Sequence, residues 1–118
     1  MYNRIAMDHF LKPRNTGELA GAPRGTAENA ECGDTAVVTI QIEGGRIVDA
    51  KFLSKGCAGA IASCSALTEL AKGRTLDEAK AIDVPALDAA LGGLPTSKRG
   101  CEEMAVNALQ GALVAAGS

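Results

Sequence analysis

Two runs of alternating apolar residues, joined by a glycine turn, constrain the fold of this chain more than any other feature. From Thr35 to Ile42 apolar side chains recur at every second position, the period of a strand with one buried face. Residues 43–46, Glu-Gly-Gly-Arg, supply a turn, and the run from Ile47 to Leu53 returns with one face formed by Val48, Ala50 and Phe52. We therefore predict an antiparallel hairpin, with a weaker first strand around Gly25 to Asn29.

Helices are predicted on both sides of this hairpin. Apolar residues repeat at helical spacing from Tyr2 to Phe10, and Pro13 ends that element. After Gly56 the pattern is helical, with predicted elements at Ala58 to Lys72, from Thr75 and its capping partner Glu78 to Ile82, from Asp83 to the glycines at 92–93, and at about Cys101 to Ala116. The predicted fold class is α+β, a small three-stranded antiparallel sheet with helices packed on one face.

Length and composition limit the possible functions. The 118 residues contain no repeat or linker, which predicts one domain over residues 1–118. A net charge of −2 and only three aromatic residues exclude a nucleic-acid surface built on basic and stacking side chains. No segment approaches the roughly 20 apolar residues of a membrane span, and the N-terminus has no signal-peptide run. A cytoplasmic protein with reduced thiols is expected.

Three of the four cysteines, Cys32, Cys57 and Cys101, adjoin a glycine, which lets the backbone approach a bound ion closely. Their separations of 25 and 44 residues are too long for a zinc finger, so the fold must assemble any shared site. Cys57 precedes one predicted helix and Cys101 opens another, where backbone amides and the helix dipole favour a thiolate. Thiolates bind soft metals and accept sulfur, and Cys101 is expected to be the most reactive of them.

Asp34 is a candidate oxygen ligand. It follows Cys32 by two residues at the start of a strand, where alternation would place both side chains on one side. We expect it in an exposed turn. A carboxylate is a harder ligand than a thiolate, so its presence among thiolates would make a bound metal centre easier to release.

These residues also have readings without a metal. Buried cysteines often act as small apolar side chains, and this is the favoured interpretation of Cys64, against an auxiliary thiol. Asp34 could simply cap a turn. His9, the only histidine, lies on the apolar stripe of the first predicted helix, which favours a structural imidazole. Lys98 and Arg99 fit either a solvated loop or groups that steer a partner or compensate thiolate charge.

Several motifs, in order along the chain, resemble the NifU/IscU-type iron-sulfur cluster assembly scaffolds. The resemblance is carried by residues 7–10 and 13–15, by Cys32-Gly33-Asp34, by Gly56-Cys57 with 61–63, by 72–73 and 75–76, by Leu91-Gly92-Gly93-Leu94-Pro95, and by Cys101. It implies a non-catalytic protein that receives sulfur from a cysteine desulfurase, builds a labile [2Fe-2S] cluster on three cysteines and passes it to apo-proteins. It further implies that Asp34 tunes release, that Cys101 accepts the persulfide, and that a homodimer can hold the cluster.

The chain departs from the family pattern at two places. Gly100 stands where family members usually carry a histidine before the last cysteine, so a nitrogen ligand is missing. The family's chaperone-binding loop, Leu-Pro-Pro-Val-Lys, reads Leu-Pro-Thr-Ser-Lys at residues 94–98, which disfavours recognition by an Hsp70-type chaperone. The alternatives to a cluster scaffold are a zinc-binding sulfur carrier with Cys101 as nucleophile and a regulatory paralogue that holds Zn²⁺ structurally.

Overall fold

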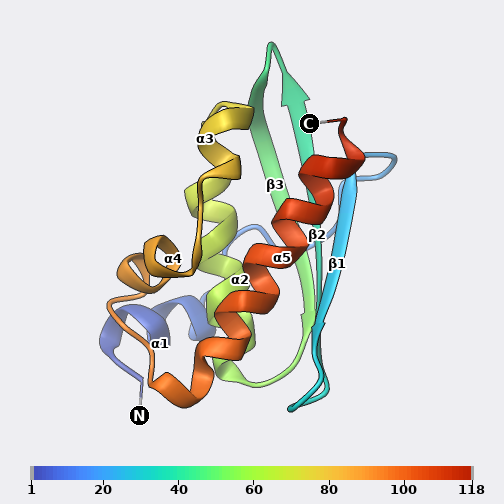
Figure 1. The fold of residues 1–118 in the computed structure, drawn as a ribbon. Coiled ribbons are helices and arrows are strands. Elements are labelled where there is room, and N and C mark those ends of the chain that lie inside the picture. Colours follow the sequence, from blue (N-terminus) through green and yellow to red (C-terminus); the bar gives the residue numbers. More distant parts are fainter. Residues whose placement is uncertain (1, 118) are drawn as a thin grey trace.

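The fold is a three-stranded sheet covered on one face by helices (Figure 1). The structure, a computed structural model, describes residues 2–117. The sheet is antiparallel in the order β1-β2-β3, with β1 Arg24–Asn29, β2 Asp34–Glu43 and β3 Arg46–Lys55. The helices are α1 Arg4–Leu11, α2 Ala58–Ala71, α3 Leu76–Lys80, α4 Val84–Ala90 and α5 Arg99–Ala115, and a short 3-10 turn, Thr96–Lys98, precedes α5. Helices α2 and α5 lie side by side on the sheet, and the predicted α+β class is confirmed.

The hairpin of β2 and β3 contains a one-residue irregularity that the alternating pattern does not reveal. Gln41 pairs with Asp49, but Ile42 pairs with Ile47, so the register skips Val48. Ile47 is therefore buried, whereas Val48 is 43% exposed. The prediction that Val48 shares the inner face with Ala50 and Phe52 is wrong, because an extra residue in one strand reverses the facing of every residue beyond it.

The helix boundaries follow the capping signals in the sequence. The predicted capping box at α3 is confirmed, since the Thr75 and Glu78 side chains each accept a hydrogen bond from the other residue's backbone N–H. Helix α5 begins at Arg99, two residues earlier than predicted. Cys57 is the residue that immediately precedes α2, and Cys101 lies in the first turn of α5. No helix within residues 2–117 is long and apolar enough to cross a membrane.

Helix α5 packs unusually close to β1 because glycines face each other there. A Cβ placed on Gly25 would lie 1.9 Å from the carbonyl oxygen of Ala108 and 2.3 Å from the backbone nitrogen of Ala112. Gly111 lies across from Gly25, and a Cβ placed on Gly111 would be only 3.2 Å from the Gly25 Cα. This close approach fixes the position of α5 on the sheet, and therefore the position of Cys101 at its first turn.

Two polar contacts tie the N-terminal segment to the rest of the fold. His9 Nδ1 lies 2.8 Å from Ser65 Oγ, and the backbone N–H of Arg14 donates to the same hydroxyl at 2.9 Å. Burial lowers the pKa of His9, which favours the neutral ring in this contact. His9 is thus engaged with α2, in agreement with its interpretation as a structural imidazole.

Residues 15–17 lie along the outer edge of β3. The N–H of Phe52 donates to the Asn15 carbonyl at 2.9 Å, and the N–H of Gly17 donates to the Phe52 carbonyl at 2.8 Å. Asn15 has a φ of 60°, a left-handed conformation that asparagine tolerates better than most residues. This segment therefore satisfies backbone groups of β3 that would otherwise face solvent.

Candidate metal centre

Three potential ligand atoms converge at one end of the sheet. One atom each from Asp34, Cys57 and Cys101 lie within 4.8 Å of one another. The two Sγ atoms are 3.8 Å apart, and Asp34 Oδ2 is 3.6 Å from Cys57 Sγ and 3.9 Å from Cys101 Sγ. The three residues come from the start of β2, the residue before α2 and the first turn of α5. The fold thus joins side chains that are 23 and 44 residues apart.

Cys32 lies outside this group in the structure. It is exposed, in the turn between β1 and β2, and the turn is closed by hydrogen bonds from the N–H groups of Cys32 and Gly33 to the carbonyl of Asn29. The expectation that strand alternation would place Cys32 and Asp34 on one side is wrong, because Cys32 and Gly33, whose φ is 71°, belong to the turn, and β2 begins only at Asp34, which is buried while Cys32 is exposed. The turn that carries Cys32 still lies at the same end of the molecule, because Asn29, which closes the turn, is the strand partner of Asp34.

Asp34 is buried and not in an exposed turn as expected. Its side chain packs against Gly56, where an added Cβ would lie 2.7 Å from the Asp34 Cγ. The glycine that precedes Cys57 is therefore needed to make room for the carboxylate. Because a buried carboxylate is costly unless it is paired, this placement suits a cation held between Asp34 and the two thiols.

Lys98 supplies a positive charge beside the thiols. Its Nζ is 3.7 Å from Cys57 Sγ, and the negative charge of Cys57, then that of Tyr2, raises the pKa of Lys98. Gly59 allows this crowding, because a Cβ there would lie 3.0 Å from the Tyr2 hydroxyl and 3.5 Å from Cys101 Sγ. Of the two readings of Lys98, the contact supports compensation of thiolate charge. Sequence reasoning missed Tyr2 and Gly59, which carry no motif of their own.

Cys101 is fully buried, and this overturns the expectation that it is the most reactive thiol of the apo-protein. Burial first, and then the neighbouring Cys57, raise the pKa of the Cys101 thiol to about 12. The backbone amides of α5 favour the thiolate, but removal of water from the sulfur outweighs them. Without bound cargo or a partner, Cys101 is a protonated, shielded thiol.

We therefore expect Cys32 to be alkylated before Cys101 in the reduced, metal-free protein. Cys32 is exposed, whereas the Cys101 sulfur is covered and neutral. Timed alkylation followed by peptide mapping measures the order. Labelling of Cys101 ahead of Cys32 would show that the thiol pocket opens readily in solution.

Cys64 serves packing. It is fully buried in α2, burial raises the pKa of its thiol to about 12, and it is not part of the ligand group found among residues 2–117. This agrees with its interpretation as a small apolar side chain.

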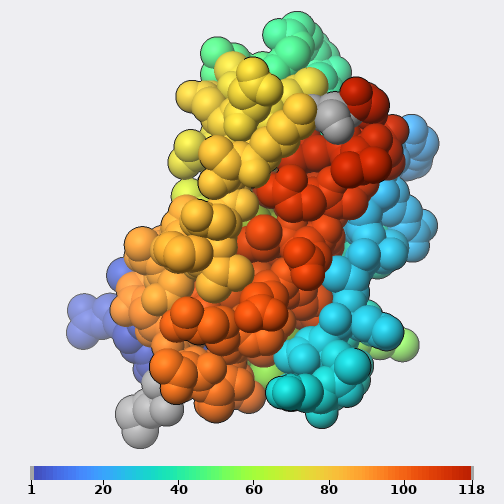
Figure 2. Space-filling view, viewed as in Figure 1, coloured from blue at the N-terminus to red at the C-terminus, as the bar shows by residue number. Residues whose placement is uncertain are grey.

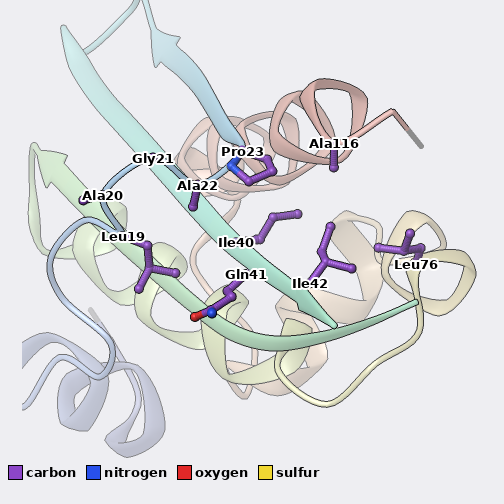
Figure 3. Close-up of a pocket in the computed structure, with 10 residues that line it drawn as sticks. All are labelled: Leu19, Ala20, Gly21, Ala22, Pro23, Ile40, Gln41, Ile42, Leu76 and Ala116. Carbon is purple, nitrogen blue, oxygen red and sulfur yellow. The ribbon is translucent and has the colours of Figure 1, made fainter. Parts of the chain in front are cut away.

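One groove in the described part of the chain lies away from the thiols. It has a volume of about 520 Å³ and is lined by a loop, the far half of β2, the start of α3 and the end of α5 (Figure 3). Ile40 and Ile42 in its wall are six and eight residues along β2 from Asp34, on the order of 20 Å away. The cluster of Asp34, Cys57 and Cys101 therefore lies at the end of the sheet and does not line this groove.

Two thiols and a carboxyl group, held by three elements of an α+β fold, define a small protein suited to hold a thiophilic metal or an iron-sulfur cluster. This chain belongs to the family of the NifU-like N terminal domain, whose model matches residues 1–116.

Two curated relatives and one solved structure illustrate the similarity. The chain is 45% identical to the iron-sulfur cluster assembly scaffold protein IscU 1 of Archaeoglobus fulgidus, over 97% of this chain and 75% of the relative. It is 38% identical to the scaffold protein IscU of Aquifex aeolicus, over 95% and 73%. A crystal structure of a candidate SUF-system scaffold from Fervidobacterium islandicum AW-1 is 22% identical, covers 95% of this chain and 96% of that one, and superposes with a TM-score of 0.73, which supports the fold.

Proposed function

We propose that this chain is an iron-sulfur cluster assembly scaffold. It accepts sulfur from a cysteine desulfurase, assembles a labile [2Fe-2S] cluster as cargo and transfers that cluster to apo-proteins. The observation that carries the proposal is the convergence of Asp34, Cys57 and Cys101 at one end of the fold, and the names of its relatives support it. In this proposal residues 1–118 act as a single, non-catalytic domain in the cytoplasm, and a homodimer can form around the cluster.

Four residues are proposed to hold the cargo. Asp34, Cys57 and Cys101 form the pre-assembled part, and Cys32 joins them when its exposed turn closes over the cluster. Thiolates are the usual ligands of cluster iron, and the carboxylate is the hardest and weakest of the four. The same donor set also fits Zn²⁺, which we expect in the protein as isolated.

Cys101 is proposed to be the persulfide acceptor. Its thiolate attacks the outer sulfur of the desulfurase persulfide, a new S–S bond forms at Cys101, and the desulfurase cysteine leaves as a thiolate. Because Cys101 is buried and protonated in the structure, its proton must first pass to solvent, and the desulfurase must uncover the sulfur. The Lys98 ammonium, next to Cys57, then stabilises the negative charge in the pocket.

Anaerobic reconstitution tests the proposed function. The reduced apo-protein is incubated with ferrous iron, a cysteine desulfurase and cysteine, and visible absorption is recorded. We expect cluster absorption that is lost in Cys57→Ser, while Cys64→Ser, the matched control in the packed interior, retains it. Tight Zn²⁺ without any cluster absorption would contradict the scaffold and favour a zinc-binding carrier or paralogue.

Asp34→Ala is expected to slow release of the cluster. The oxygen ligand is the one that water or a client thiol displaces most easily, so its loss removes the exchangeable position. The measurement is the rate of cluster transfer to an apo-ferredoxin, with wild type and variant loaded to equal occupancy. Transfer by the variant at the wild-type rate or faster would show that Asp34 does not provide that position.

A further inference from the structure

Asn29 connects to three parts of the centre, although it carries no ligand itself. It is the last residue of β1, and its strand partner is Asp34. Its backbone carbonyl accepts hydrogen bonds from the N–H groups of Cys32 at 3.2 Å and Gly33 at 2.8 Å. The backbone of Asn29 thus anchors the turn that presents Cys32.

The side chain of Asn29 lies against Gly100. A Cβ placed on Gly100 would be 2.8 Å from Asn29 Nδ2, 3.2 Å from Cγ and 3.3 Å from Oδ1. Gly100 lies in the first turn of α5, immediately before Cys101. Figure 2 shows the cyan surface of the β1–β2 turn against the orange surface where α5 begins, which is the side of the molecule where this contact occurs.

We propose that Asn29 is a positioning residue of the metal centre: its carboxamide, seated on the side-chain-free Cα of Gly100, sets the distance between the Cys32 turn and the first turn of α5. The inference rests on the proposed function only in taking Cys32 as a ligand. Asn29 occupies the space that a side chain at residue 100 would need, which is a physical reason for glycine at that position.

The contact matters because Cys32 and Cys101 lie on different elements. The Cys32 turn joins β1 to β2, whereas Cys101 belongs to helix α5, which is fixed on β1 by the Gly25 contact. A side chain at residue 100 would push the flexible end of Asn29 aside, which costs little stability but separates the turn from the helix. The carboxamide is also neutral, so it fills this space without adding charge to a pocket that already holds a carboxylate and two thiols.

Co²⁺ alone, added to the reduced apo-protein under anaerobic conditions, tests the inference. The thiolate-to-Co²⁺ charge-transfer absorption grows with the number of bound thiolates, so Cys32→Ser defines the level without Cys32. We expect Gly100→Ala to lose about one third of the wild-type intensity, reaching the Cys32→Ser level. We also expect its Kd for Co²⁺ to rise about tenfold with an unchanged unfolding midpoint. Asn107→Ala, an exposed amide on α5, is the matched control and should behave as wild type.

The double variant Asn29→Ala/Gly100→Ala separates positioning from a general effect on α5. Asn29→Ala alone should weaken Co²⁺ binding, and the added Gly100→Ala should then cost nothing more, because no carboxamide remains to be displaced. An equal cost of Gly100→Ala in both backgrounds overturns the inference. So does a wild-type spectrum identical to that of Cys32→Ser. Co²⁺ binding requires no sulfur donor, so these outcomes are independent of whether a cluster can be assembled.

Discussion

Glu102→Gln is expected to stabilise the apo-protein by on the order of 3 kcal/mol at pH 8. Glu102 is fully buried in α5, and neither of its carboxyl oxygens has a hydrogen-bond partner within residues 2–117. Burial first, and then the neighbouring Asp88, raise the pKa of Glu102 from 4.5 to about 8. The folded protein therefore keeps this carboxyl protonated at a pH where the unfolded chain has lost the proton.

The sign of the pH dependence follows from this raised pKa. Between pH 4.5 and about 8 folding takes up a proton, so the free energy of unfolding contributed by Glu102 falls by up to about 1.4 kcal/mol per pH unit and is lowest above pH 8. Glutamine has no proton to take up. Denaturant unfolding at pH 5 and pH 8.5 should show a gain for Glu102→Gln at the higher pH that shrinks at the lower one. Glu103→Gln, at an exposed neighbouring position, is the control. A gain equal at both pH values would contradict the ionisation argument.

Gly25→Ala is expected to destabilise the protein by about 3 kcal/mol or more. The new Cβ would lie 1.9 Å from a backbone oxygen of α5, and backbone cannot rotate away as a side chain can. The helix must move off β1, which also displaces Cys101. We therefore expect lower metal content in addition to a lower unfolding midpoint.

Gly111→Ala is the matched comparison on the other side of this contact. Its Cβ would meet the Gly25 Cα at 3.2 Å, a tight approach that a small shift relieves. Alanine also favours a helix by up to about 1 kcal/mol over glycine, so the net change should be small. Thermal or denaturant unfolding of both variants measures the difference. Similar stabilities would mean that α5 is free to shift on the sheet.

The sequence was a good guide where a pattern is local. Alternation in β2 and β3, the capping box at Thr75 and the glycines after α4 all depend on neighbours in the chain, and the structure confirms the elements they predict. The irregularity at Val48 depends on how two strands pair, and the contact between Gly25 and α5 depends on residues more than 80 positions apart. Neither leaves a periodic signal.

The metal centre could be predicted only in part, because its geometry also depends on residues that are far apart in the chain. Asp34, Cys57 and Cys101 were identified by residue type, and the fold brings them together; Cys32 was also identified, but its turn leaves it exposed. The reactivity of Cys101 differs from the prediction because two opposing effects act on its thiol. A helix terminus favours a thiolate by about 0.3–1 kcal/mol. The rise of its pKa from 9.0 to about 12 corresponds to about 4 kcal/mol, and its largest cause is burial, which only the folded structure reveals.

Residues 15–17, which form a strap along β3, affect whether the sheet can aggregate through its edge strands. An uncovered strand edge offers free N–H and C=O groups to which another chain can add a strand. Within residues 2–117, backbone pairing by the strap covers part of the β3 edge, which leaves β1 as the edge without a paired neighbour. That strand has only six residues and exposes the charged side chains of Arg24 and Glu28. Short length and charge make β1 a poor template for strand addition, so the sheet resists unintended aggregation.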